Sequence, residues 1–475
     1  MSIRWGRVRI NVMTSVLTRI APSPTGQDFH IGNAYTALIN YVFAKKNNGQ
    51  FVVRIEDTDR TRFIEGSEKR ILKSLHWLGL DPDESTEKGG PYKPYRQSER
   101  LDIYKKNAEE LVEKGHAYYC FCTQERLEQM RKDQEAHHLP PMYDGICKKL
   151  DPKESKERVG QGEKHVIRLN VPEEGTTVFH DVIRGDISFE NKLIDDQVLL
   201  KSDGFPTYHL GVVVDDHIMK ISHIIRGEEW ISSTPKHILL YQFFGWKPPV
   251  FAHMPLLRNP DKSKLSKRKN PVWVSWYKEQ GFLPEAILNY LATLAWAFPG
   301  GKEIFTLEEM IQKFTLEAIQ TTAPIFNIEK LHWMNGEYIR QTSNPELKEL
   351  LYQHVTTVTR EYDSLLDKIL PLVKERMKTL NEFWTLSSFF FEKSKTFERP
   401  VKKELLNIAK NALISSDWAH DTMEQAIRMG AEKAGTKAKD VFMELRIAIT
   451  GKTVGPPLLE SLEILGKKET LVRLQ

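Results

Sequence analysis

The N-terminal part of the chain reads as a strand, a turn, a helix and a second strand, in that order. Val16–Ala21 is a short apolar run of β-prone residues, and Pro22–Gly26 has the composition of a turn. From Gly32 onward apolar residues recur at helical spacing, and Phe51–Ile55 then alternates as a strand does. A helix between two such strands is typical of parallel sheets. The segment therefore predicts an α/β fold built on a doubly wound parallel sheet of the Rossmann type.

The α/β pattern is interrupted in the middle of the chain and then resumes. Residues 116–205 contain all the cysteines, the polar stretch Gln124–Glu163 and short strand-like runs, which together favour an inserted α+β domain. Beyond the insertion, Gly211–Val214 and His223–Ile225 are predicted to be strands, and a helix is expected after Ser233. These elements indicate one catalytic sheet whose two halves are separated by the insertion.

The remainder of the chain has a different character. Beyond about Glu337 the pattern is helical almost throughout, with no convincing strand run, so an all-α C-terminal region in two subdomains is expected. The predicted division of the chain, in order, is 1–16, 17–115, 116–205, 206–250, 251–336 and 337–475.

Composition limits the functional classes. Of the 475 residues, 40% are apolar and 28% are charged, which is typical of a globular protein. The longest apolar stretch, near Ile287–Phe298, is too short to span a bilayer, so no membrane anchor is expected. Three cysteines in so long a chain argue against a disulfide framework and favour a reducing compartment, the cytoplasm. The net charge of +4 neither demands nor excludes a nucleic-acid partner.

The segment before the first acidic residue, Asp28, is basic and contains Arg4, Arg7, Arg9 and Arg19. An organelle transit peptide has this charge pattern. An unstructured extension, or translation that truly begins at Met13, also accounts for it. The shortness of the segment favours these two interpretations.

The first motif that bears on chemistry is Phe29–Asn33, between the first strand and the first helix. A helix N-terminus offers unpaired backbone N–H groups and the positive end of a dipole, which suits phosphate. Gly32 allows close approach of a ligand to the backbone, and His30 can donate to phosphate oxygens. A histidine and a glycine in a turn are common without any function, so this motif is weak by itself.

The second motif is the cationic run Lys262–Lys269, in a loop after the strand-like Phe251–Leu257. Such a run is most often solvated surface. Mobile lysines in a loop can also follow a triphosphate and neutralise the charge that builds up during phosphoryl chemistry.

Taken in order along the chain, the motifs identify a family. Ala21–Gly26, His30-Ile-Gly32, Arg54–Asp59 and Lys264–Arg268 resemble the corresponding segments of glutamyl-tRNA synthetases, including their versions of the two class I signatures, HIGH and KMSKS. The resemblance is strong over about residues 17–340 and looser beyond. The first signature ends in Asn33 instead of histidine, at a position that is relaxed in the glutamate branch.

The resemblance implies a reaction and its participants. Glutamate and ATP would form glutamyl-adenylate, with Mg²⁺ present, and the glutamyl group would pass to the 3′ end of tRNA-Glu. It implies an acceptor-binding domain at 116–205, a loop and stem-contact domain at 251–336 and an anticodon-binding region at 337–475, in a protein expected to be a monomer. Catalysis is assigned to His30, Lys264 and Lys267, and ATP binding to His30, Gly32, Trp230, Lys264, Ser266 and Lys267.

The glutamate contacts also follow from the resemblance, and they agree with residue chemistry. Arg19 and Arg226 match the arginines that bind glutamate, and a planar guanidinium suits a carboxylate. Glu56 matches the partner of the substrate ammonium group. Further contacts around the amino acid are expected from Ala21, Ser23 and Tyr208.

The cysteines follow the pattern Cys120-x-Cys122 and then Cys147. Some members of the family hold zinc here, with a fourth ligand two residues after the last cysteine. That position is Lys149, a poor ligand, and a structural zinc usually has four. Zinc with a ligand from His137, His138 or Asp151, and three reduced thiols without metal, both remain open.

The helical C-terminal region resembles the anticodon-binding part of bacterial glutamyl enzymes. Arg376 lies where some members have an arginine near the third anticodon base, which would favour tRNA-Glu over tRNA-Gln; it is otherwise a solvated helix residue. Other interpretations are an enzyme that also charges tRNA-Gln, a shortened paralogue that glutamylates a base of tRNA-Asp, a small-molecule nucleotidyltransferase, and an RNA-binding module without activity. The helical tail argues against the paralogue and the nucleotidyltransferase.

Overall fold

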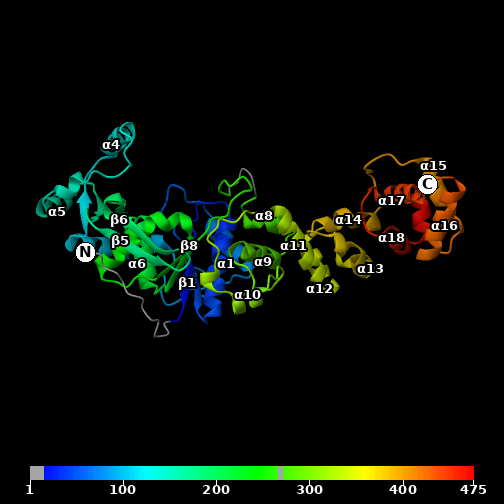
Figure 1. The fold of residues 1–475 in the computed structure, drawn as a ribbon, viewed down its shortest axis with the longest axis horizontal. Helices are drawn as coiled ribbons and strands as arrows, with labels where there is room; N and C mark the ends of the chain where they lie inside the picture. The colour runs from blue at the N-terminus through cyan, green and yellow to red at the C-terminus, as the bar shows by residue number, and fades with distance from the viewer. Residues whose placement is uncertain (1–14, 266–270, 475) are drawn as a thin grey trace. The chain divides into compact units, whose positions relative to one another are not determined.

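The structure, a computed structural model, describes residues 15–265 and 271–474. The chain divides into two compact units (Figure 1). Unit 1 comprises Met1–Ser275 and Leu288–Phe326, and unit 2 comprises Trp276–Ile287 and Asn327–Gln475. Within the described residues, no helix is both long enough and apolar enough to cross a membrane.

The parallel sheet predicted from the sequence is confirmed in unit 1. Strand β1 (Leu17–Ile20) pairs in parallel with β2 (Gln50–Val53), and helix α1 (Ile31–Lys46) connects them. Strand β8 (His223–Gly227) pairs in parallel with β9 (Val250–Met254). The two pairs adjoin, because the backbone N–H of Ser222 donates to the carbonyl of Leu17 at 2.9 Å. Figure 1 shows α1 beside β1 and β8.

Two strands from the middle of the chain extend this sheet. Strand β5 (Thr176–Asp181) bridges to β9 in parallel and pairs with β6 (Gly185–Glu190) antiparallel. A separate antiparallel sheet contains β3 (Ala117–Cys120), β4 (Val166–Leu169) and β7 (Val198–Leu200), in the order β3-β4-β7. Around the second sheet lie α4 (Gln124–Ala136) and α5 (Pro152–Gly160). The region 116–205 thus supplies both its own sheet and two strands of the main one.

One predicted strand is wrong. Gly211–Val214 belongs to helix α6 (Tyr208–Ile218). The whole run from Leu210 to Asp216 is buried, so the helix has no polar face there that would betray its period. Short apolar runs of β-branched residues look alike in strands and in buried helices. The remaining helices before the second signature are α2 (Ser67–Trp77), α3 (Leu101–Glu113) and α7 (Thr234–Phe244).

Unit 2 is helical throughout its described residues, as the sequence pattern predicts. Its core includes Leu366, Ile369, Leu370 and Val373, which occupy one face of α13 (Asp363–Val373) at helical spacing. Helices α8 (Val274–Glu279) and α9 (Pro284–Ala295) each have residues in both units, and α10 (Leu307–Lys313) belongs to unit 1. Those that follow are α11 (Ile328–Gln341), α12 (Asn344–His354), α13 (Asp363–Val373), α14 (Glu382–Phe391), α15 (Lys403–Ser415), α16 (His420–Lys433), α17 (Ala438–Thr450), α18 (Leu458–Leu465) and α19 (Lys467–Arg473).

Candidate active site

A cavity of about 1040 Å³ opens in unit 1 where the parallel strands end. Ala21 follows β1, Gly227 ends β8 and Pro255 follows β9, and all three line the cavity. Ligands of doubly wound sheets bind in this place, outside the carboxyl ends of the strands. The structure gathers ten of the residues expected at the site around this cavity, namely Arg19, Ala21, Ser23, His30, Gly32, Glu56, Tyr208, Arg226, Trp230 and Lys264.

His30 caps the N-terminus of α1. Its Nδ1 accepts the backbone N–H of Gly32 at 3.0 Å, so a neutral ring carries its proton on Nε2. The adjoining segment is tied down because Ile31 donates its N–H to the carbonyl of Val272 at 2.7 Å. A β-carbon on Gly32 would lie 3.1 Å from His30 Nδ1, which explains the glycine. His30 thus presents an N–H donor beside a helix N-terminus, an arrangement suited to phosphate oxygens.

Only part of the lysine-rich loop can be described. Lys264 is exposed, lines the cavity, and is fixed at its backbone by a bridge to Arg258. The carbonyl of Lys264 also accepts from the side-chain amide of Asn259 at 3.0 Å. Ser266 and Lys267 lie outside the described residues.

Arg19 and Glu56 are connected through a buried ion network. Asp216 in α6 accepts from Arg19 Nη2 at 3.2 Å and from Arg54 Nη1 at 2.8 Å. Arg54 also donates to Glu56 at 3.1 Å through its Nη2, and its Nε lies 3.5 Å from Asp215. Arg54, Asp215 and Asp216 are almost wholly inaccessible to solvent, whereas Arg19 and Glu56 reach the cavity. The network thus holds the cation of Arg19 and the carboxyl group of Glu56 at the same wall of the cavity.

Glu56 has an unusual ionisation range. Its side chain is 11% exposed, and burial raises its pKa to about 7, although Arg54 and Arg19 oppose that shift. A positively charged group in the cavity would favour the ionised form. The geometry therefore suits binding of an ammonium group.

Arg226 is a buried cation that forms hydrogen bonds with neutral side chains. Its Nε donates to His253 Nε2 at 3.1 Å, Nη1 to the Tyr208 hydroxyl at 2.9 Å, and Nη2 to Thr234 Oγ1 at 2.9 Å. The ring of His237 lies 3.3 Å from Nη1. The residue is only 4% exposed, and among the described residues no carboxylate pairs with it. A buried charge in neutral surroundings is costly unless an anion arrives, which marks this end of the cavity as an anion site.

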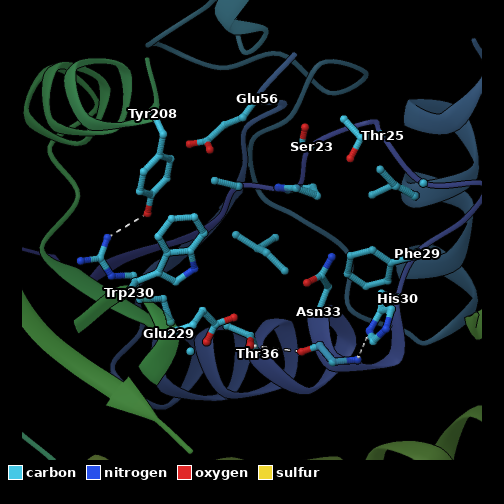
Figure 2. Close-up of a pocket in the computed structure, with 18 of the residues that line it drawn as sticks. Ser23, Thr25, Phe29, His30, Asn33, Thr36, Glu56, Tyr208, Glu229 and Trp230 are labelled. Atoms are coloured by element: carbon cyan, nitrogen blue, oxygen red, sulfur yellow. Dashed lines mark hydrogen bonds between the residues drawn. The ribbon is translucent and has the colours of Figure 1, made fainter. Parts of the chain in front are cut away.

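Aromatic rings flank this anion site. Figure 2 shows Tyr208 and Trp230 on one side of the cavity and His30 on the other. The rings of Tyr208 and Trp230 lie 4.2 Å apart at an interplanar angle of 33°. Trp230 belongs to the 3₁₀ helix η4 (Glu228–Ser233), directly after Arg226 and Gly227. The rings of Tyr208 and Trp230 and the N-terminus of α1 thus lie on opposite sides of the cavity.

The sequence pattern did not identify the residues that hold these side chains in place. None of these residues belongs to either signature, and only burial and contacts reveal them; they are Asp181, Asp216, Thr234, His237 and His253. The adjacent acids Asp215 and Asp216, in an otherwise apolar run, were the one available signal.

The three cysteines come together in the inserted region. Ligand atoms of Cys120, Cys122 and Cys147 lie within 4.8 Å of one another. The hydroxyl of Tyr143 lies 3.4 Å from the sulfur of Cys120 and 3.2 Å from that of Cys122. Among the described residues, no histidine, aspartate or glutamate joins the three thiols. The ligand set thus fits a metal that accepts three sulfurs and one oxygen.

In this structure none of the three residues suggested as a fourth ligand joins the cysteines. The ring of His137 contacts the carbonyl of Asp133 at 2.7 Å, and Asp151 caps α5 by accepting from Lys153 and Glu154. His138 does not join the cluster either. His138 instead adopts a left-handed backbone conformation in the turn after α4, and Asp151 is the N-cap of α5.

Arg376 lies in unit 2, at the end of the 3₁₀ helix η7 (Lys374–Arg376). Its side chain is exposed. Burial and the charge of Arg376 both lower the pKa of Arg446, so the two guanidinium groups are close enough to interact. This pair of cations suits a polyanionic partner.

Comparison with known proteins agrees with this geometry. The family described as tRNA synthetases class I (E and Q), catalytic domain, matches residues 15–333, and an anticodon binding domain matches residues 345–475. A glutamate–tRNA ligase of Thermus thermophilus is 47% identical over 97% of this chain and 99% of its own. One from Acidothermus cellulolyticus is 46% identical over 97% of this chain and 95% of its own.

A solved structure agrees as well. The glutamate tRNA ligase from Elizabethkingia meningosepticum, in complex with its amino acid, is 37% identical, with a TM-score of 0.84 over 97% of this chain and 98% of its own. The matched domains and the full-length identity lead to one conclusion: the chain belongs to the class I aminoacyl-tRNA synthetases, in the family of the glutamate–tRNA ligases.

Proposed function

We propose that this enzyme, a glutamate–tRNA ligase of protein synthesis, binds glutamate between Arg226 and the Arg19–Glu56 wall and activates it with ATP at the N-terminus of α1. The observation that carries the proposal is the buried guanidinium of Arg226 with neutral partners only. A substrate carboxylate would supply the missing anion. Glu56 would attract the substrate ammonium group, and Arg19 would attract the second carboxylate. Ala21 and Ser23 complete the wall of the cavity.

ATP would occupy the other side of the cavity. His30, Gly32 and Lys264 would contact its phosphates, and Trp230 would border the nucleotide, with Ser266 and Lys267 of the signature loop joining them. Mg²⁺ would accompany the phosphates as part of the nucleotide substrate. These residues act by positioning and by stabilising charge, because the reaction needs no covalent enzyme intermediate.

The chemistry has two steps. An oxygen of the glutamate α-carboxylate attacks the α-phosphorus of ATP, and the bond from that phosphorus to the bridging oxygen breaks, so that pyrophosphate leaves. A ribose hydroxyl at the 3′ end of tRNA then attacks the activated carbonyl carbon. It loses its proton, and AMP leaves. His30 and the lysines stabilise the negative charge that develops on phosphate oxygens in the first step.

The test of this proposal is charging of purified tRNA-Glu and tRNA-Gln with labelled glutamate, with and without ATP and with glutamine as a control. ATP-dependent charging of tRNA-Glu alone is the expected result. Charging of both tRNAs would mean that the enzyme does not discriminate between them. Failure to charge either tRNA would contradict the proposal.

We also propose that the cysteine cluster holds a structural zinc ion, with Tyr143 as the fourth ligand. Three sulfurs within 4.8 Å and a hydroxyl at 3.2–3.4 Å from two of them support this ligand set. Metal analysis of the purified protein should find one zinc per chain. The same analysis of Tyr143→Phe should find weaker retention against a chelator. A wild-type protein without zinc would contradict the proposal and leave three reduced thiols.

The sequence-based division into six segments, the monomeric state and a cytoplasmic location belong to the same proposal. Three unpaired cysteines support a reducing compartment. Light scattering of the purified protein should give the mass of one chain, 55.1 kDa. A mass of twice that value would contradict the monomer.

A further inference from the structure

Two buried side chains stand in line behind the guanidinium of Arg226. Asp181, the last residue of β5, accepts at Oδ2 from His253 Nδ1 at 2.6 Å and from the backbone N–H of His253 at 3.0 Å. The other ring nitrogen of His253, Nε2, faces Arg226 Nε at 3.1 Å. Asp181 and His253 are both 0% exposed, and neither is among the described residues that line the cavity. The Nε2 atom of His253 also lies 3.2 Å from the hydroxyl of Thr234, but of these two contacts only Arg226 lines the cavity, so Arg226 is the direct link to a substrate.

The strands place this line of residues. Arg226 on β8 is the direct partner of His253 on β9 in the parallel ladder. Asp181 ends β5, where that strand meets β9, and its Oδ1 accepts the backbone N–H groups of Ile183 and Arg184 at 3.0 Å each. Both oxygens of the carboxylate thus have fixed donors: Oδ2 contacts His253 on β9, and Oδ1 accepts from the turn that joins β5 to β6.

The direction of each hydrogen bond follows from the chemistry of arginine. A guanidinium only donates, so His253 Nε2 must accept and its proton must lie on Nδ1, which donates to Asp181. Burial lowers the pKa of His253 to about 4, which keeps the ring neutral and able to accept. The other tautomer would set two N–H groups against each other at Arg226. Asp181 therefore selects the tautomer that Arg226 needs.

The neutral ring also separates two charges. Arg19 is in direct contact with the carboxylate of Asp216, which already offsets its charge. Around Arg226 the contacts are with Tyr208, Thr234 and two neutral histidines, and the nearest anion in this line is one imidazole away. A carboxylate in direct contact would compete with a substrate carboxylate for the same donors. An imidazole fixes Nε without that competition.

We infer that Asp181 and His253 are positioning residues that fix Arg226 through a tautomer-locked hydrogen bond and thereby determine the preference for an amino acid with a side-chain carboxylate over its amide analogue. The inference rests on the proposed role of Arg226, with the side-chain carboxylate of glutamate as the one that Arg226 binds. A guanidinium held at Nε directs its remaining donors to one place. If that hold is lost, the group can turn, the carboxylate loses its matched donors, and the oxygen of an amide serves almost as well.

Steady-state kinetics of the full-length enzyme with ATP and tRNA-Glu test this inference through two variants of His253. His253→Leu removes the acceptor, and we expect the KM for glutamate to rise about tenfold or more, as for other residues that orient a binding group. The KM for ATP and kcat should change far less, and the ratio of kcat/KM for glutamate over glutamine should fall. His253→Gln offers an oxygen near the place of Nε2 and should restore most of the affinity.

A matched control lies on the same strand as Arg226. His223 is also a histidine whose pKa burial lowers to about 4, but it contacts Phe43 and Ser222 and does not line the cavity. His223→Gln should leave the KM for glutamate and the glutamate-to-glutamine ratio as in the wild type. A general loss of packing would affect both histidine sites alike.

Asp181→Asn provides an independent signature that a merely structural residue would not give. The ¹⁵N resonances of labelled histidine, assigned with His253→Gln, should show the Nδ1–H tautomer at His253 in the wild type and a shift toward Nε2–H in Asp181→Asn. The variant should also raise the KM for glutamate. If His253→Leu does not fold, these two measurements decide the matter.

The outcomes separate the two proposals. Unchanged glutamate KM and unchanged selectivity in His253→Leu, or an unchanged tautomer and KM in Asp181→Asn, would overturn the positioning role. Arg226→Leu distinguishes the cause: if it also leaves the KM for glutamate unchanged, the proposed glutamate site itself is wrong. If Arg226→Leu raises that KM steeply while His253→Leu does not, only the inference about Asp181 and His253 fails.

Discussion

At the scale of single residues, the pKa of Glu56 predicts how substrate affinity depends on pH. Because burial raises that pKa to about 7, the carboxyl group is largely protonated below pH 7 and ionised above it. Only the ionised form attracts an ammonium group. The KM for glutamate should therefore rise as the pH falls from 8 to 6, and pH profiles of aminoacylation measure this directly.

Glu56→Gln is the matched variant for that profile. It should have a high KM for glutamate at every pH, without the rise between pH 8 and 6. Without substrate, the raised pKa means that the folded state holds this proton more tightly than the unfolded chain does. The contribution of Glu56 to stability is thus lost as the pH rises through the range from 4.5 to 7. A wild-type KM for glutamate that does not change between pH 8 and 6 would contradict the assignment of Glu56 to the ammonium group.

A second residue-scale prediction concerns Asp216, which lies between two buried arginines. Burial acts to raise the pKa of Asp216, but Arg19 and Arg54 hold this pKa below its usual value. Asp216→Ala would leave both guanidinium groups without their shared partner. We expect a loss of about 3–5 kcal/mol in the free energy of unfolding, measured with urea. Glu109→Ala, at an exposed position on α3, should change it by less than about 0.5 kcal/mol.

At the scale of elements, one substitution at the N-terminus of α1 should affect stability and activity in different ways. Gly32→Ala places a β-carbon 3.1 Å from His30 Nδ1, so the imidazole must move and the amide of residue 32 is covered. Alanine is favoured over glycine within a helix by roughly 0.5–1 kcal/mol. The variant should thus form adenylate more slowly while melting at the same or a higher temperature.

Gly160→Ala is the control for that prediction, because a β-carbon at Gly160 in α5 meets no atom within 4 Å. It should keep normal rates of pyrophosphate exchange in the presence of tRNA. Equal rates in Gly32→Ala and the wild type would show that close approach of phosphate to this glycine is not needed.

The same scale explains what the sequence could and could not predict. The first strand, the turn and α1 carry both a clear period and turn chemistry, so these elements were predictable, and His30 could be suggested from its place before a helix. The role of Arg19 was assigned only through the resemblance. Helix α6 is buried along the run from Leu210 to Asp216 and resembled a strand. This error concealed Asp216, and residues such as His253 carry no local signal because their role arises from strand neighbours in space.

At the scale of the whole molecule, the two units differ in how far sequence reasoning reaches. In unit 1, ordered motifs separated by more than two hundred residues converge on one cavity, and their order along the chain identified the family. In unit 2 the helical pattern predicted the class of fold but gave no side-chain chemistry, since solvated cations occur on most helices. The role of Arg376 could be suggested only from the resemblance. Its proximity to Arg446 could be found only from the structure.

This proximity supports a prediction about tRNA choice. Two neighbouring guanidinium groups repel each other in the free protein, and a phosphate or a base edge relieves that repulsion. Arg376→Ala should therefore raise the KM for tRNA-Glu, with kcat for pyrophosphate exchange at saturating tRNA unchanged, because unit 1 holds the residues that bind the amino acid and ATP.

If Arg376 reads the anticodon, the ratio of kcat/KM for tRNA-Glu over tRNA-Gln should also fall in Arg376→Ala. An equal loss of kcat/KM for both tRNAs would assign Arg376 to the phosphate backbone. Lys378 is an exposed cation two residues further on, and Lys378→Ala is the control for a purely electrostatic effect.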